Sequence, residues 1–456
     1  MRLSKLRASL AFAIVSLAGC AGPRHPNEVT LKVALPATHF RLENGLEVLL
    51  HEDHSTSDVV VNLRYHVGSK DDPEGRSGFA HLYEHMMFLG TKHVGDDGFA
   101  AALEKIGVRE FNATTNEDRT EYYDIVPARQ LPAALWLEAT RMAYPLDAVE
   151  QQNFDREREV VKNEWRERYD NVPLGHLHNL VREAVFPAGH PYHHPTIGRP
   201  TDLDRATLEE ARAFGATYYT PVNATLVIAG DFDKNQAHEL VARYFGNIPS
   251  GKPNAPKSLR FQKIIGKKRI VVEADVETPR VVLAWPIPPP HTRGYDELMI
   301  AAGYATGWAN YELVATSKMA RLAWTDVDTG RLGSILSITV DLEPNGNPEK
   351  AIDAIDDEIR RIPDHRDWPD FSDRRTARMT SAVLGLQSID NRAAWMQESL
   401  SLFGTHDVSQ SELQRIQDIH APNMVAATTE YLRDTGRIEV VVRPKRGAPR
   451  AGRVVQ

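Results

Sequence analysis

The sequence predicts an α+β protein made of two homologous domains, each an α/β sandwich with a mainly antiparallel sheet packed against helices. Three observations predict this class. β-branched and alternating runs are interleaved with apolar helical stretches along most of the 456 residues. A segment rich in Pro, Gly and Lys, PSGKPNAPK at 249–257, interrupts this pattern. The same order of strands and helices then begins again, which indicates duplication of one α+β unit.

Composition places the chain among soluble globular proteins. Apolar residues make up 42% and charged residues 25% of the chain, near the averages for globular domains. This excludes a disordered chain, a collagen-like repeat and a polytopic membrane protein. Lys and Arg total 54 against 62 Asp and Glu, a formal net charge of −8, so we expect no nucleic-acid partner. The single cysteine excludes an internal disulfide and a zinc site built from cysteines.

The N-terminus has the features of a secretory signal. A basic stretch at 1–7 precedes an apolar run at 8–18 that is too short to span a bilayer. The run ends in Leu-Ala-Gly-Cys, which resembles a bacterial lipobox, so we expect 1–19 to be a lipoprotein signal peptide and Cys20 to carry the lipid anchor. Ala21 rather than Asp follows, as in signals sorted to the outer membrane, which predicts a folded body in the periplasm. The alternative is an ordinary signal peptide with a chance cysteine.

The first domain follows a linker. Residues 20–38 contain prolines and no clear period, and we expect them not to pack into the domain. The domain, 39–250, opens with two alternating runs around Asn44-Gly45, the strongest short-range hairpin signal. Periodicity then predicts its other elements, in order: a strand at 58–67, a helix at 78–89, a strand at 223–231 and a helix at 235–245.

The second domain repeats this plan after a linker at 251–266. It spans 267–445, begins with two strands and closes with a helix and a strand. These elements are strands at 268–273 and 278–285, a helix through Tyr431 and a strand at 438–442. A basic tail, 446–456, completes the chain, and we expect a frayed, solvated end.

One predicted helix carries residues with metal chemistry. His81, Glu84 and His85 form the pattern H-x-x-E-H within 78–89. At about 100° per residue the two histidines lie one turn apart on one face, with Glu84 beside His85. Two neutral imidazoles at this spacing can bind one Zn²⁺, and the carboxylate can reach a metal-bound water. The pattern predicts metal-assisted hydrolysis with Glu84 as the general base.

A solvated polar helix face would give the same short pattern. The neighbouring residues argue against it, because they make this helix apolar nearly all round, as in a buried helix. A tetrahedral site needs a third ligand, and 154–165 offers Glu157 and Glu164, two turns apart on nearly one face. The alternative for that segment is a salt-bridged surface helix.

These motifs closely resemble the pitrilysin family of inverted-zincin metallopeptidases, which includes insulin-degrading enzyme and the mitochondrial processing peptidase. The likeness covers most of the first half and extends to further segments: E-x6-E at Glu157 and Glu164, Asn112-Ala113-Thr114-Thr115, and Tyr219-Thr220-Pro221-Val222-Asn223. By resemblance, one Zn²⁺ per chain is bound by His81, His85 and Glu164, and Glu157 orients the site. The resemblance also implies that Asn112 and Ala113 lie on an exposed sheet edge to which an extended peptide adds as a strand.

The second half departs from the family pattern in one segment. Family members of this length pair with a second chain of similar fold, and one second-half element usually carries an Arg and a Tyr that bind the substrate carbonyl. Here Arg321 stands one position off and Trp324 occupies the tyrosine's place. An indole has one N–H and no hydroxyl, so it is a poor replacement. We therefore expect a heterodimer with a homologous, zinc-free subunit that supplies the Arg and Tyr, unless Arg321 shifts into place or Tyr304 or Tyr311 takes over.

The sequence favours one function over two alternatives. The leading hypothesis is a hydrolase, a zinc metalloendopeptidase that cleaves unfolded or flexible peptides in the periplasm. The first alternative is a non-catalytic peptide-binding or assembly subunit with a vestigial site. It gives no reason to keep a base, Glu84, beside two metal ligands. The second alternative is a processing peptidase dedicated to one substrate.

Overall fold

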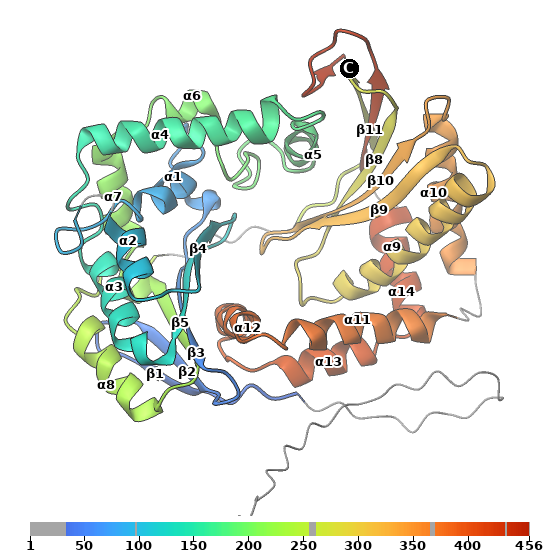
Figure 1. Ribbon diagram of the computed structural model, residues 1–456. Coiled ribbons are helices and arrows are strands. Elements are labelled where there is room, and N and C mark those ends of the chain that lie inside the picture. The colour runs from blue at the N-terminus through green and yellow to red at the C-terminus, as the bar shows by residue number, and fades with distance from the viewer. Residues whose placement is uncertain (1–32, 96–97, 255–260, 365–369, 434–435, 456) are drawn as a thin grey trace, which may run out of the picture. The chain divides into compact units, whose positions relative to one another are not determined.

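The computed structural model describes residues 33–95, 98–254, 261–364, 370–433 and 436–455 (Figure 1). The described residues from Ala34 onward belong to one compact unit. The predicted signal peptide, Cys20 and most of the predicted linker lie outside the described residues. None of the helices in the described part of the chain has both the length and the apolar character that a membrane crossing needs.

The first sheet has six strands in the order β1-β2-β6-β3-β5-β4. Their bounds are β1 (Thr38–Arg41), β2 (Glu47–Glu52), β3 (Asp58–Tyr65), β4 (Glu110–Thr115), β5 (Thr120–Pro127) and β6 (Ala224–Gly230). Every neighbouring pair is antiparallel except β2 and β6. The predicted hairpin is confirmed as β1 and β2, and Gly45 in its turn has a φ of +93°, which favours glycine.

The second sheet repeats the first strand by strand. Its order is β12-β7-β11-β8-β10-β9. Its bounds are β7 (Lys267–Ala274), β8 (Arg280–Ile287), β9 (Ala320–Asp328), β10 (Ser334–Leu342), β11 (Arg437–Pro444) and β12 (Arg453–Val454). Here too the one parallel pair, β7 and β11, stands where β2 and β6 stand in the first sheet. The predicted α+β fold with a duplicated unit is confirmed.

Helices cover both sheets. In the first half they are α1 (Phe79–Met86), α2 (Gly98–Lys105), α3 (Leu131–Ala143), α4 (Gln151–Trp165), α5 (Leu177–Val185), α6 (Pro200–Leu203), α7 (Leu208–Tyr218) and α8 (Lys234–Phe245). In the second half they are α9 (Tyr295–Ala309), α10 (Pro348–Arg361), α11 (Phe371–Gly385), α12 (Ile389–Phe403), α13 (Ser409–Gln417) and α14 (Ala421–Thr428). A five-residue π-helix, Arg166–Asp170, continues α4 without a break.

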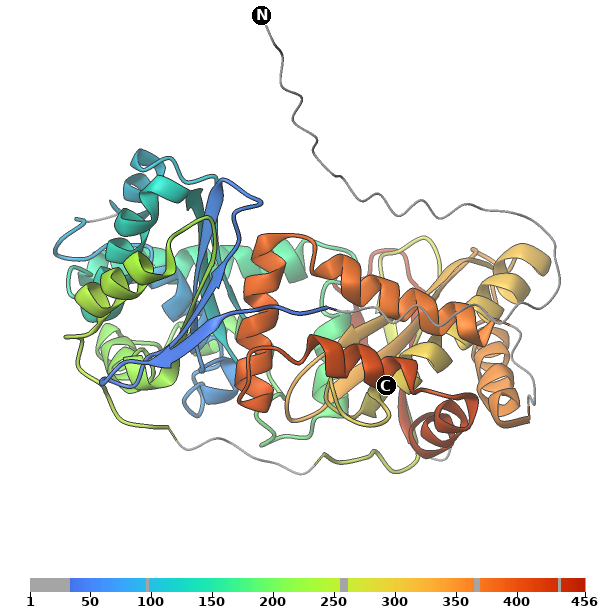
Figure 2. The ribbon, with the colours of Figure 1, turned by 90° about the horizontal axis from the view of Figure 1, so that it is seen from below.

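The two halves exchange a helix across their sheets. Helix α12, from the second half, lies against β3 and β6 of the first sheet, where Met396 packs beside Val60 and Val227 (Figures 1 and 2). Helix α5, from the first half, lies against β8 and β11 of the second sheet, where Val181 packs beside Val440. Each sheet therefore buries one face with a helix that belongs to the other half of the sequence.

Two sequence predictions about the ends of the fold are wrong. The basic tail is not frayed, because Arg453 and Val454 pair antiparallel with β7 and their backbone joins the second sheet. The segment before β1 does pack into the fold, because Leu35 is 4% exposed and lies in the cluster that α12 closes. Its backbone N–H also donates a hydrogen bond of 2.8 Å to Asp407.

Candidate metal centre

The start of α1 is fixed by its surroundings. The helix is preceded by Gly78, whose φ of +87° is left-handed. A Cβ there would lie 2.3 Å from the carbonyl oxygen of Ile197, so only glycine fits. The carboxylate of Asp72 accepts hydrogen bonds from the backbone N–H groups of Gly78 and Ala80, at 2.7 and 2.8 Å. These contacts set which residues of α1 face the interior.

The helix is buried on nearly all sides, as the sequence predicted. Seven of its eight residues are buried, including His81 and Glu84, and only His85 is partly exposed. Polar side chains in such a helix need partners, because burying them without hydrogen bonds or a metal costs free energy. The partners of these three residues come from α4 and β4.

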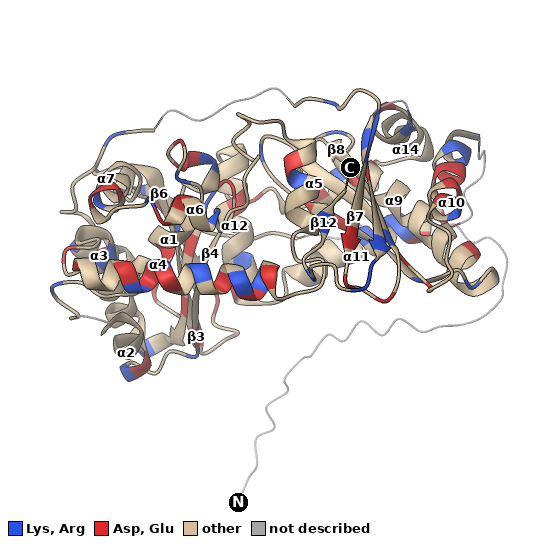
Figure 3. Ribbon diagram, turned by 90° about the horizontal axis from the view of Figure 1, so that it is seen from above, with Lys and Arg blue, Asp and Glu red and all other residues tan. Residues whose placement is uncertain are grey.

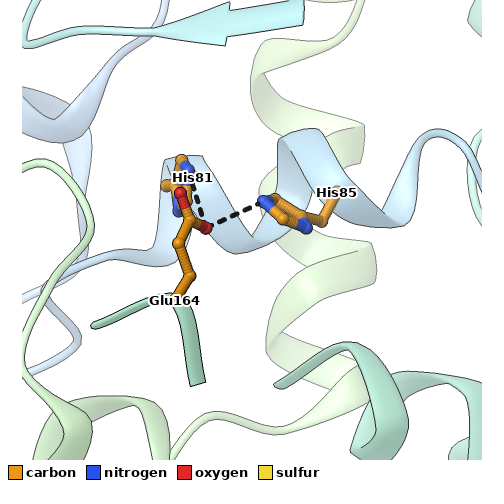
Figure 4. Close-up of side chains that lie close together, drawn as sticks. All are labelled: His81, His85 and Glu164. Atoms are coloured by element: carbon orange, nitrogen blue, oxygen red, sulfur yellow. Dashed lines mark ion pairs between the residues drawn. The ribbon is translucent and has the colours of Figure 1, made fainter. Parts of the chain in front are cut away.

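His81, His85 and Glu164 converge at one point (Figure 4). The Oε2 atom of Glu164 lies 3.8 Å from Nε2 of His81 and 3.5 Å from Nε2 of His85. One ligand atom from each residue falls within 4.8 Å of the other two, and this is the one such group in the part of the chain that the structure describes. Ligands about 2.1 Å from a tetrahedral zinc lie about 3.4 Å apart, close to the 3.5 and 3.8 Å between Oε2 of Glu164 and the two histidine nitrogens.

Unpartnered atoms support this fit. Oε2 of Glu164 and Nδ1 of His81 are buried and have no hydrogen-bond partner in the described structure. A carboxylate oxygen in this state loses its solvation without compensation. A metal ion bound at Oε2 would compensate that loss, and zinc accepts this combination of two imidazoles and one carboxylate.

The two histidines differ in charge. Burial lowers the pKa of His81 to about 4, with a contribution from the charge of neighbouring His85, so His81 is neutral at pH 7, the form that binds metals. Burial also acts against the charged form of His85, but the nearby carboxylates of Glu157 and Glu164, at 3.8 and 3.5 Å, outweigh it and raise its pKa to about 9. His85 therefore bridges the two glutamates as a cation in the metal-free chain, and metal binding must displace its proton.

Glu84 lies beside this group and faces the same pocket. Its Oε2 atom accepts a hydrogen bond of 2.5 Å from the hydroxyl of Thr115, at the end of β4. Burial raises the pKa of Glu84, and the Thr115 hydrogen bond opposes that shift. A buried carboxylate with a raised pKa has the basicity that a proton acceptor needs near neutral pH.

The pocket at this centre has a volume of about 390 Å³. It is lined by residues of α1, α4 with its π-helical continuation, β4 and the loop before α6: His81, Glu84, His85, Asn112, Ala113, Thr114, Thr115, Glu164, Arg168, Tyr169, Thr196 and Ile197. Among the described residues, strand β4 is the last strand of the sheet and pairs only with β5. The structure thus brings Asn112 and Ala113 to an open sheet edge beside the predicted ligands.

Helix α4 carries Glu157 and Glu164, and acidic and basic residues are interleaved along it (Figure 3). Oε2 of Glu157 lies 3.8 Å from Nδ1 of His85, so Glu157 approaches the ring on its other side. Oε1 of Glu164 accepts a contact of 2.5 Å from the guanidinium of Arg168. The sequence analysis did not single out Arg168, although its i,i+4 spacing from Glu164 was a usable signal.

The second-half residues singled out in the sequence lie outside this pocket. Arg321 and Trp324 stand on β9, the edge strand of the second sheet, and neither lines the pocket. Arg321 is exposed and 3.4 Å from Glu343, and the indole N–H of Trp324 donates to Asp326. Tyr304 is buried on α9 and Tyr311 is 60% exposed, and neither reaches the pocket within the described chain.

The duplicated unit has lost the metal residues. Helix α9 also follows a left-handed glycine, Gly294, with a φ of +97°. Counting from the two glycines, Glu297, Ile300 and Ala301 stand where α1 has His81, Glu84 and His85. The base and both histidines are therefore absent from the second half.

Comparison with known proteins agrees with these observations. The model of a family described as Insulinase (Peptidase family M16) matches residues 47–196, which include every predicted site residue, and a model described as Peptidase M16 inactive domain matches residues 205–370. The chain is 27% identical over 424 residues to a protein named zinc protease PqqE from Helicobacter pylori, over 88% of this chain and 92% of that protein.

Solved structures show the same fold. The crystal structure of a protease from Helicobacter pylori superposes with a TM-score of 0.81 at 25% identity, covering 90% of this chain and 99% of the other. The periplasmic protease PqqL from Escherichia coli gives a TM-score of 0.75 at 19% identity. This alignment covers 90% of the present chain and 48% of that one, so the chain spans about half of that protein's length.

Proposed function

The chain belongs to the insulinase family of peptidases, and we propose that it is a zinc-dependent endopeptidase that hydrolyses peptide bonds in unfolded or flexible peptides. One observation carries the proposal. Ligand atoms of His81, His85 and Glu164 gather within 4.8 Å, and the carboxylate of Glu84 lines the same pocket. The loss of these residues from the second half supports one zinc per chain.

We assign a different role in hydrolysis to each residue of the centre. His81, His85 and Glu164 would hold the zinc, which when bound acidifies water and polarises a carbonyl. Glu84 accepts a proton from the attacking water and returns it to the leaving amine nitrogen. Glu157 holds the ring of His85 from its Nδ1 side, which orients the ligand.

The open edge of β4 supports an extended substrate. A peptide that adds as a strand beside Asn112 and Ala113 would form main-chain hydrogen bonds and would bring its carbonyl groups past Glu84. Main-chain pairing places little demand on sequence, but it requires a segment free to extend. This favours unfolded or flexible substrates.

We also propose that the chain works with a homologous, zinc-free subunit that supplies an Arg and a Tyr. The support is that Arg321 and Trp324 of this chain stand on β9, outside the pocket lining. One missing oxyanion donor costs about 10²–10³ in kcat, so the chain alone would be slow. Turnover would be measured on the purified, zinc-bound chain before and after adding the candidate subunit. Full activity of the chain alone, abolished by Arg321→Ala, would contradict the heterodimer.

A periplasmic location with a lipid anchor at Cys20 is proposed from the lipobox. The E. coli protein of similar fold is described as periplasmic. Mass spectrometry of the mature protein should find acylated Cys20, and Cys20→Ser should release a soluble or unprocessed protein. We expect the folded body of the Cys20→Ser variant to keep its peptidase activity.

Metal analysis together with peptide turnover tests the enzyme proposal. The purified chain should contain about one zinc and cleave an unstructured fluorogenic peptide. A chelator should abolish cleavage, and added zinc should restore it. Stoichiometric zinc with no cleavage of any unstructured peptide, with and without a homologous subunit, would favour a non-catalytic peptide-binding or assembly subunit. Cleavage confined to one protein would favour a dedicated processing peptidase.

A further inference from the structure

Thr115 is the residue that the structure places directly against the general base. It ends β4, and its hydroxyl donates a hydrogen bond of 2.5 Å to Oε2 of Glu84. This length is typical of a hydroxyl donating to an ionised carboxylate. Among the described residues, no second hydrogen bond holds the Glu84 carboxylate.

Thr115 is held in place by its partner strand. Thr115 pairs across the ladder with Thr120, and their hydroxyl oxygens are 3.2 Å apart. Thr120 is fully buried and donates a hydrogen bond of 3.0 Å to the carbonyl of Val67. Since the Thr115 hydroxyl donates to Glu84 and the Thr120 hydroxyl donates to Val67, the two side chains pack together without a hydrogen bond between them. The ladder pairing with Thr120 fixes where Thr115 stands.

Hydrogen bonds also stabilise the turn that follows Thr115. The side-chain oxygen of Asn116 accepts hydrogen bonds from the backbone N–H groups of Asp118 and Arg119, at 2.8 and 2.9 Å. The backbone N–H of Asn116 donates to the carbonyl of Arg119 at 3.0 Å. Thr115 thus stands at a rigid junction between the open sheet edge and the base.

We propose that Thr115 is a positioning residue for Glu84, an inference that rests on the proposed peptidase function. By holding Oε2, it fixes the Glu84 carboxylate in the pocket that His81 and His85 also line. A glutamate side chain has three rotatable bonds and would otherwise visit other rotamers. A displacement of about 1 Å at a reacting group costs up to about 10²-fold in rate.

Two substitutions separate the hydroxyl from the rest of the side chain. Thr115→Val keeps the β-branched shape that suits a strand and removes only the hydroxyl. We expect kcat to fall by about 10- to 100-fold, with KM and zinc affinity within about twofold of the wild type. Thr115→Ser keeps the hydroxyl and should retain most of the wild-type kcat.

A matched control and a double mutant complete the test. Thr225→Val removes a buried threonine hydroxyl from the same sheet, one that contacts His66 at 3.0 Å, and should leave kcat unchanged. In a Glu84→Gln background, Thr115→Val should change the residual rate by no more than about twofold, because Thr115 acts through Glu84.

The outcomes distinguish two kinds of failure. If the zinc-bound wild-type protein cleaves no unstructured peptide, the proposed peptidase function itself is contradicted. An active wild type whose Thr115→Val variant keeps the wild-type kcat would overturn the positioning role alone. Equal losses in the Val and Ser variants would also overturn it, since the hydroxyl would then not be the cause.

Discussion

The two glutamates of α4 have different surroundings at the scale of single residues. Oε2 of Glu164 lies within 3.8 Å of both His81 and His85 and has no hydrogen-bond donor. Glu157 approaches only His85, on the Nδ1 side. This geometry supports the choice of Glu164 as the ligand, which sequence spacing left open between the two and resemblance alone assigned.

Substitution of these glutamates should therefore have unequal effects on zinc binding. Glu164→Gln removes a ligand and should cause the larger loss of affinity. Glu157→Gln removes a group that orients His85 and should lower zinc affinity by about 10- to 100-fold. Zinc affinity is measured by competition with a chelator of known affinity. Normal affinity in the Glu164 variant and a zinc-free Glu157 variant would reverse the assignment.

Arg168 holds the far oxygen of Glu164 and should support its role as a ligand. Arg168→Met keeps the aliphatic stem and removes the donor, so we expect zinc affinity to fall by about tenfold. Arg166→Met, on the same π-helix, is the matched control, because the guanidinium of Arg166 is exposed and donates to Asn163 rather than to Glu164. Equal losses in the two variants would indicate a general effect of charge.

At the scale of elements, α12 is the helix that joins the second half to the first sheet. Gln397 donates from its amide to the carbonyl of Thr225 and to the backbone and side chain of Asn62, all within 3.0 Å. Arg392 pairs with Asp53, just after β2, at 2.5 Å. Burial acts to raise the pKa of Asp53, but hydrogen bonds from Ser55 and the charge of Arg392 outweigh it and lower the pKa to about 2.

This ion pair should make the docking of α12 dependent on pH. A carboxyl whose pKa is lower in the folded state stabilises the fold above its unfolded pKa and loses that effect as pH falls. Asp53→Asn should therefore lower the free energy of unfolding by about 1 kcal/mol at pH 7. The difference in the free energy of unfolding between wild type and Asp53→Asn, measured by urea unfolding, should become smaller below about pH 4. A difference in the free energy of unfolding that stays constant from pH 7 to pH 3 would contradict the role of the Asp53 charge.

Sequence reasoning worked where the signal was local. The hairpin at Asn44-Gly45, the buried strands and the H-x-x-E-H helix all follow from short patterns of turn residues or periodicity. The exchange of α5 and α12 could not be predicted, because the apolar pattern of a helix does not indicate which of two sheets the helix packs against. Thr115 was missed for a similar reason, since its contact with Glu84 depends on how β4 meets α1 in space.

At the scale of the whole molecule, the exchanged helices make the two halves depend on each other. The sequence predicted domains at 39–250 and 267–445 joined by a linker, as if each could pack alone. Val60 and Val227 of the first sheet are buried against α12, which belongs to the second half. Removal of the second half would expose this face to water.

Separated halves should therefore fold poorly alone and associate when they are mixed. A fragment covering 33–254 should be aggregation-prone by sedimentation velocity, whereas co-expression with 261–455 should give a soluble 1:1 complex. The apolar face that α12 covers is the cause. A soluble, monomeric and cooperatively unfolding first-half fragment would show that α12 is dispensable for the fold.

The account depends most on the claim that Glu84 is the base of a zinc-dependent hydrolysis. The direct measurement is the turnover of an unstructured fluorogenic peptide by wild type and by Glu84→Gln at equal, stoichiometric zinc occupancy. The amide keeps the size of the side chain and cannot accept a proton, so we predict normal zinc content and a loss of at least about 10²-fold in kcat. A Glu84→Gln variant that binds zinc and cleaves the peptide at the wild-type rate would contradict the claim.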